Sequence, residues 1–100
     1  MKVRLVLSGG IVGIVRECEV DSASLPPEAA DELLRLVRGS GIRESGAFLS
    51  DTARDLQQYE ITIEDEQGTR SVIFDDASLP PEARPMLGFL KRRARPHPPG

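Results

Sequence analysis

Acidic side chains are the most abundant groups in this sequence that could do chemistry, and a pair of them could act as general acid and base. They fall at expected strand edges, turns and helix starts, where carboxylates are usually solvated or cap a helix. We therefore interpret them as surface and capping groups. The carboxylates considered are Asp51, Asp55, Glu60, Glu64, Asp65, Glu66, Asp75 and Asp76.

Histidine and cysteine occur once each, as His97 and Cys18. One residue of each kind cannot supply the ligands of a structural zinc site. His97 lies between prolines near the end of the chain, where we expect neither a cysteine nor a serine nucleophile to use it. The sequence therefore predicts no catalytic residue, no metal site and no cofactor, and we expect the protein not to be an enzyme. A single cysteine forms no internal disulfide, which favours a reducing, cytoplasmic location.

A glycine-rich segment, Ser8–Gly13, is at first sight similar to a phosphate-binding loop. It lacks the lysine of that motif, and a strand-like segment rather than a helix follows it. Glycine supplies the positive φ angles that tight hairpins need. The segment is therefore predicted to be the turn of a β-hairpin.

The composition is typical of one soluble globular domain, because 100 residues allow a single modest core and 29% of them are charged. The net charge is −3 and the body of the chain has no concentrated basic segment, so we expect no nucleic-acid partner. The apolar stretch 3–15 is interrupted by Arg4 and by Ser8–Gly10, and no small-residue cleavage site follows it. It predicts neither a secretory signal nor a membrane span.

An internal repeat organises the chain. The sequence DSASLPPEA at 21–29 returns as DDASLPPEA at 75–83, and each copy follows a strand-like segment and opens a helix-like one. The paired prolines fit a helix start, because proline is favoured at the first helical position. The pattern predicts two tandem β-β-α units.

Alternation of apolar and polar residues predicts four strands, at 2–7, 11–20, 57–64 and 69–74. Helical spacing predicts a helix from Pro27 to Gly39 and a second one that begins near Pro85. The simplest assembly is an α+β fold, in which a four-stranded antiparallel sheet carries both helices on one face.

The stretch 40–56 is then a long connection, which we expect Phe48 and Leu49 to hold against the core. We assign a single domain to residues 1–95 and a disordered proline-rich tail to residues 96–100.

Two motifs, in this order, resemble the emfourin family. The S-G-G-apolar-x-G pattern at Ser8–Gly13 follows a first strand, and a D-x-x-x-Y pattern at Asp55–Tyr59 leads into the third. With the helix starts, the similarity covers Val3 to Leu90. The family is known for protein inhibitors of thermolysin-like, protealysin-type zinc metallopeptidases, so the resemblance implies that function and such a peptidase as partner. Ile11 stands where an aromatic residue is usual, which bears on the identity of the target.

The resemblance also implies a mechanism, in which the hairpin tip and the 50–58 loop enter the partner's cleft and block substrate. Asp51 or Asp55 would either approach the partner's zinc or form hydrogen bonds within its own loop. Tyr59 would pack at the core or sheet edge, with its hydroxyl at the interface. The implied partner-binding residues are Ser8, Gly9, Gly10, Ile11, Gly13, Asp51, Asp55 and Tyr59.

A different class of function fits the same sequence. The chain could be a non-inhibitory interaction or regulatory domain that pairs through its sheet, with another protein or with itself. An assay against thermolysin-like peptidases separates the two hypotheses. For an inhibitor we expect a monomer in the free state.

Overall fold

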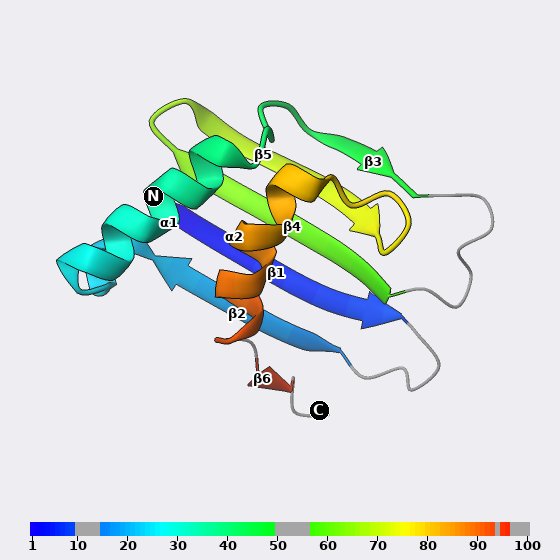
Figure 1. Cartoon of the computed structure of the whole chain (residues 1–100), viewed down its shortest axis with the longest axis horizontal. Coiled ribbons are helices and arrows are strands. Elements are labelled where there is room, and N and C mark those ends of the chain that lie inside the picture. Colours follow the sequence, from blue (N-terminus) through cyan, green and yellow to red (C-terminus); the bar gives the residue numbers. More distant parts are fainter. Residues whose placement is uncertain (10–14, 50–56, 94, 97–100) are drawn as a thin grey trace.

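The computed structural model describes residues 1–9, 15–49, 57–93 and 95–96. It shows an α+β fold in which both helices cover one face of a mixed sheet (Figure 1). The strands are β1 (Lys2–Gly9), β2 (Arg16–Asp21), β3 (Gly46–Phe48), β4 (Gln57–Asp65), β5 (Gly68–Asp75) and the two-residue β6 (Arg95–Pro96). The helices are α1 (Pro27–Gly39) and α2 (Arg84–Lys91), with short 3-10 turns at Ser22–Ser24 and Pro81–Ala83.

The four central strands follow the prediction, and the two edges of the sheet do not. Pairs β1–β2, β1–β4 and β4–β5 are antiparallel. However, the sheet has six strands in the order β3-β5-β4-β1-β2-β6, and β3 runs parallel to β5. The prediction of a purely antiparallel, four-stranded sheet was wrong because strands of two or three residues are too short to show an alternation of period two.

Strand β2 is shorter than predicted, since it begins at Arg16 and the preceding described residue, Val15, is outside it. Val12 and Ile14, which fall within the predicted strand 11–20, lie outside the described residues. Pro96, the first residue assigned to the tail, pairs with Arg16 in β6.

Helix α1 has the predicted bounds. Pro27 occupies its start, and the hydroxyl of Ser40 closes its end by donating to the Val37 carbonyl at 2.6 Å. Its buried face is narrow: Leu33 and Val37 are buried, whereas Leu34 is 37% exposed. Helix α2 begins at Arg84, close to the predicted start, after the 3-10 turn that the two prolines impose.

The internal repeat corresponds to one type of turn that leads each hairpin into its helix. The Asp21 carboxylate accepts a hydrogen bond from the Ala23 amide at 3.0 Å, and the Asp75 carboxylate accepts one from the Ala77 amide at 2.8 Å. Asp75 is fully buried and also accepts from the Ser78 amide at 2.8 Å. Each copy therefore uses its aspartate to satisfy backbone amides where the strand ends.

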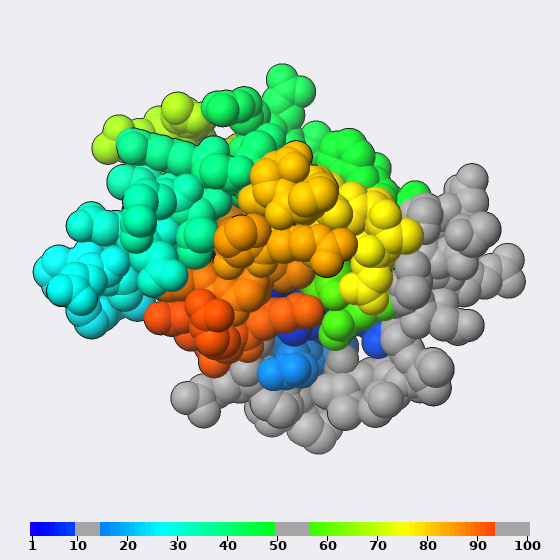
Figure 2. Space-filling view, in the orientation of Figure 1, coloured from blue at the N-terminus to red at the C-terminus, as the bar shows by residue number. Residues whose placement is uncertain are grey.

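The core lies between the helices and the sheet, and Figure 2 shows the helices covering that face. Strand residues on this face alternate with residues on the open face, where polar and charged groups pair across strands. Examples are Arg4 with Glu17 at 3.2 Å and Lys2 with Glu19 at 3.5 Å. Such exposed ion pairs contribute little to stability, so the fold depends on the apolar layer between the helices and the sheet. Its fully buried members include Val3, Leu5, Leu7, Leu33, Ile61, Ile63, Met86, Phe89 and Leu90.

Candidate protein-binding site

The two segments predicted to bind a partner are attached to the same end of the sheet. Gly9, the last residue of β1, is paired with Gln57, the first residue of β4. Gln58 in turn is paired with Asp75, the last residue of β5. The end of β1 therefore lies beside the start of β4, and Figure 1 shows this arrangement.

Only part of the predicted site belongs to the described residues. Ser8 is half-buried in β1, and Gly9 has a φ of 82°, a left-handed conformation that suits the start of a glycine turn. Tyr59 lies in β4, where it is paired with Leu7 of β1. Gly10, Ile11, Gly13, Asp51 and Asp55 all lie outside the described residues, so their predicted roles stay predictions.

Tyr59 is an internal residue. It is 3% exposed, and its hydroxyl donates a hydrogen bond to the carboxylate of Asp76. The Lys91 ammonium lies 3.4 Å from the same hydroxyl and 4.9 Å from the ring centroid. The hydroxyl is thus bonded within the protein, and it ties β4 to the turn after β5 and to α2.

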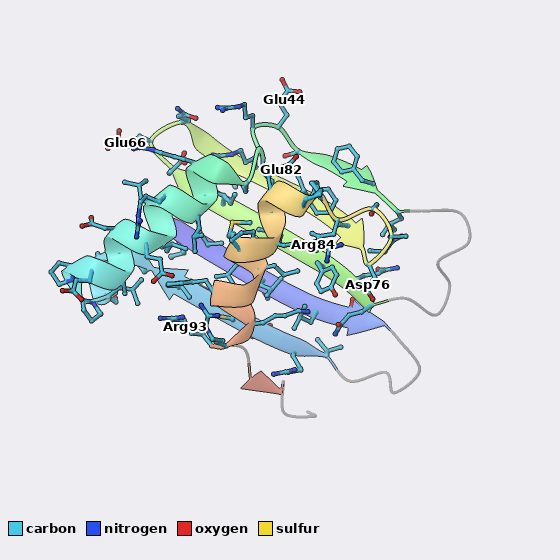
Figure 3. All side chains as sticks on the ribbon, viewed as in Figure 1. Glu44, Glu66, Asp76, Glu82, Arg84 and Arg93 are labelled. Carbon is cyan, nitrogen blue, oxygen red and sulfur yellow. The ribbon has the colours of Figure 1, made fainter. Side chains whose placement is uncertain are left out.

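Asp76 was not among the predicted site residues, since both aspartates of the repeat were interpreted as capping groups. In the structure the two have different roles. Asp75 caps the turn, while Asp76 is exposed and accepts the hydrogen bond from Tyr59. Asp76 and Arg84 both lie toward this end of the molecule (Figure 3). A buried tyrosine hydroxyl needs a partner, and that requirement indicates a partner for Tyr59 without distinguishing Asp76 from Asp75.

Burial is the main cause that raises the pKa of the Tyr59 phenol well above its ordinary value of 10.0. The hydrogen bond to Asp76 and the charge of that carboxylate raise this pKa further, and Arg84 opposes them. The phenol therefore stays protonated at physiological pH and keeps donating to Asp76. The arrangement positions the start of β4 and offers no group for catalysis.

Tyr59 is the only tyrosine and the chain has no tryptophan, so phenolate absorbance reports on this residue alone. We expect the native protein to ionise Tyr59 only well above pH 10.0, and Asp76→Asn to lower that pKa without restoring the ordinary value. Because the pKa of Tyr59 is raised in the folded state, its protonated phenol contributes to the free energy of unfolding. This contribution is complete below pH 10.0 and is lost as pH rises through the pKa of the folded state.

A spectrophotometric pH titration of native, variant and denaturant-unfolded protein checks this expectation. The unfolded sample serves as the reference with an ordinary phenol. A native titration that coincides with the unfolded one, or an Asp76→Asn titration identical to the native one, would contradict the assignment.

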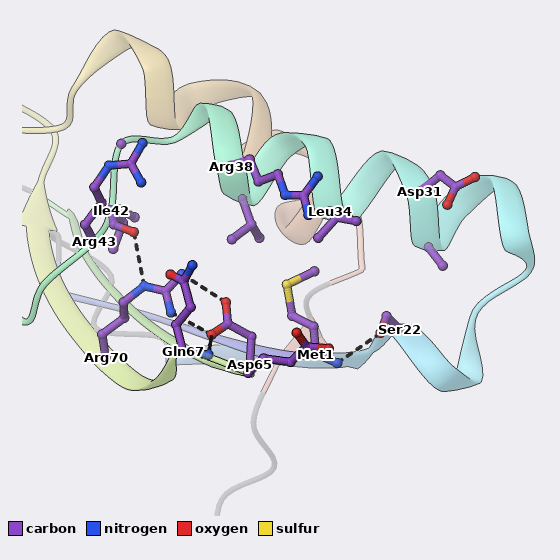
Figure 4. A pocket seen from close by; sticks show the side chains of 14 residues that line it. Met1, Ser22, Asp31, Leu34, Arg38, Ile42, Arg43, Asp65, Gln67 and Arg70 are labelled. Atoms are coloured by element: carbon purple, nitrogen blue, oxygen red, sulfur yellow. Dashed lines mark hydrogen bonds and ion pairs between the residues drawn. The ribbon is translucent and has the colours of Figure 1, made fainter.

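A hollow of about 660 Å³ lies at the opposite end of the sheet, between α1 and the β4–β5 turn (Figure 4). Arg70 forms two parallel contacts of 3.1 Å with Asp65 and donates to the Ile42 carbonyl at 3.1 Å. The Arg70 hydrogen bonds lower the pKa of the Asp65 carboxyl. These groups satisfy one another, so the hollow has a structural ion pair in its wall and is remote from the predicted binding segments.

Within the described ranges, no three histidine, cysteine or acidic residues are arranged to hold a metal ion. Likewise, no described helix has the length and apolar character needed to cross a bilayer.

Comparison with known protein families gives a match to this chain. The model of the Emfourin family matches residues 5–91, from β1 to the end of α2. No curated protein and no solved structure matches the chain. The matched span contains both sides of the sheet end described above, including Gly9, Gln57, Tyr59 and Asp76.

Proposed function

The chain belongs to the Emfourin family, and on that premise we propose that it inhibits a thermolysin-like zinc metallopeptidase of the protealysin type. Membership supports a metallopeptidase-inhibitor role in general, because the family is one of inhibitors. The thermolysin-like target and the mechanism are the proposal. In that mechanism, surface segments of the inhibitor occupy the active-site cleft and exclude substrate, and no residue of this chain performs catalysis.

The observation that carries the mechanism is the pairing of Gly9 with Gln57. It sets the end of β1 beside the start of β4, and in this proposal the segments attached at these two points enter one cleft. Glycines allow a close approach of backbone to backbone. One segment contributes Ser8, Gly9, Gly10, Ile11 and Gly13, and the other contributes Asp51 and Asp55.

The base of the second segment is held in place before binding. Tyr59 is buried and bonded to Asp76, and it lies two residues after Gln57, where the described chain resumes. A preorganised element loses less conformational entropy on binding than a flexible one. Tyr59 and Asp76 are therefore positioning residues in this proposal, which also includes a monomeric free state and action in the cytoplasm.

The deciding experiment is a titration of the purified protein into thermolysin and into a protealysin-type peptidase, followed by cleavage of a quenched peptide. We expect activity to fall in proportion to added inhibitor and to reach zero near equimolar ratio. Loss of activity must persist with zinc added at a concentration that leaves the free peptidase active, because a chelator would be neutralised. A serine peptidase provides the control. Full activity of both metallopeptidases at a large molar excess would overturn the proposal.

A further inference from the structure

The two edges of the sheet differ in how far they are protected from pairing with another strand. On the β2 side, β6 pairs with Arg16 and Glu17, and its Pro96 has no amide to offer to another strand. On the other side, no strand of the described part of the chain lies beyond β3. Residues 46–49 include neither a charged residue nor a proline, the usual devices that protect an edge.

Strand β3 also presents apolar side chains. Phe48 is 52% exposed and Leu49 is 43% exposed, although both were predicted to be held against the core. The Phe48 ring stacks on the buried Phe74, with centroids 5.3 Å apart and planes 19° apart. One side of the ring is thus supported from within the sheet, and the rest of it faces solvent.

Gly46 makes this ring position possible. A Cβ atom at Gly46 would lie 2.8 Å from the Cζ atom of Phe48, which is too close for any real contact. The Phe48 ring therefore packs against Gly46 as well as against the Phe74 ring. These two contacts favour one position of the exposed aromatic surface.

We propose that β3 is a second contact site for the peptidase, and that it pairs with an extended apolar segment of that partner. Open N–H and C=O groups at a sheet edge select an extended backbone, and Phe48 with Leu49 selects apolar side chains on it. This inference rests on the proposed function, and it adds an interface outside the two segments already assigned.

The position of β3 supports the peptidase as the occupant. Since β3 is parallel to β5, with Phe48 opposite Phe74, the strand points toward the sheet end that holds Asp75, Gln58 and Gly9. A partner seated at that end can reach Leu49 without leaving it. A second copy of the chain fits less well, because a three-residue strand with two exposed apolar side chains falls far short of the roughly 800 Å² per partner that a stable dimer buries.

The test measures the inhibition constants of Phe48→Glu and Leu49→Glu against the peptidase that the wild-type protein inhibits. We expect each to weaken inhibition about tenfold or more, because each buries a charge opposite an apolar segment. Leu34→Glu is the matched control, since Leu34 is 37% exposed on α1, and we expect it to inhibit as the wild type does. Gly46→Ala displaces the Phe48 ring without removing it and is expected to weaken inhibition several-fold.

Thermal unfolding of each variant separates binding from folding, and Leu49→Glu decides the matter if Phe48→Glu does not fold. Wild-type inhibition that is retained in both glutamate variants would overturn this inference and leave the proposed function intact. Absence of inhibition by the wild type would overturn both. A concentration-dependent dimer in sedimentation that Phe48→Glu abolishes would also overturn it, because a second copy would then occupy β3.

Discussion

Phe89→Ala is expected to lower the free energy of unfolding by about 3–5 kcal/mol, the usual range for removing a buried aromatic side chain. Phe89 is 1% exposed and lies in the second half of α2. The Arg93 guanidinium covers its ring at 3.8 Å from the centroid and donates to its carbonyl at 3.0 Å. Because domains of this size are stable by only about 5–15 kcal/mol, the variant should lose a large fraction of the protein's stability.

Urea unfolding of the wild type, Phe89→Ala and Phe48→Ala measures this effect. Phe48 is the matched control, since it is the same residue type but half-exposed, and it loses mainly its stack on Phe74, worth about 1 kcal/mol. Equal losses for the two variants would show that α2 contributes less to the core than its burial indicates.

Gly10→Arg is expected to weaken inhibition at least about 100-fold, which corresponds to about 2.7 kcal/mol of binding free energy. The residue follows Gly9, at the point where the proposed binding segment leaves β1. A long charged side chain there would keep the backbone of the segment away from the cleft and bring a hydrated cation into it. The measurement is the inhibition constant against the same peptidase, with thermal unfolding as the check on the fold.

Gly39→Arg provides the matched control for that substitution. Gly39 is exposed at the end of α1, and a Cβ atom there would meet nothing within 4 Å. A cation is also favourable near a helix C-terminus. We expect this variant to inhibit as strongly as the wild type. If Gly10→Arg also retained full inhibition, the hairpin tip would not be part of the blocking surface.

Much of the fold could be predicted from the sequence because its signals are local and repeated. The LPPEA sequence marks both helix starts, and Pro27 and Arg84 begin helices where the pattern indicates. Strands of eight or nine residues, such as β1 and β4, show a clear alternation. Strand β3 could not be predicted, because its pairing with β5 depends on where α1 returns the chain, and three residues carry no period.

For the candidate site, the sequence indicates two segments but not the contacts that surround their attachment to the sheet. The glycine motif and the motif before Tyr59 pointed to two segments, and the sheet register brings their ends together. The bond from Tyr59 to Asp76 spans 17 residues and depends on the packing of β5 against β4. Asp75 and Asp76 are neighbours of the same type, so the sequence could not tell which one caps the turn and which one holds Tyr59.

The sheet register also determines what happens if a peptidase cuts the segment it binds. A cut between Gly9 and Arg16 would create two new chain ends, but β1 stays paired to both β2 and β4 along its length. The same holds for a cut between Leu49 and Gln57, because β3 and β4 each remain paired to β5. Neither fragment can diffuse away without dismantling the sheet, so a chain cut in either segment would keep its two parts together in one fold.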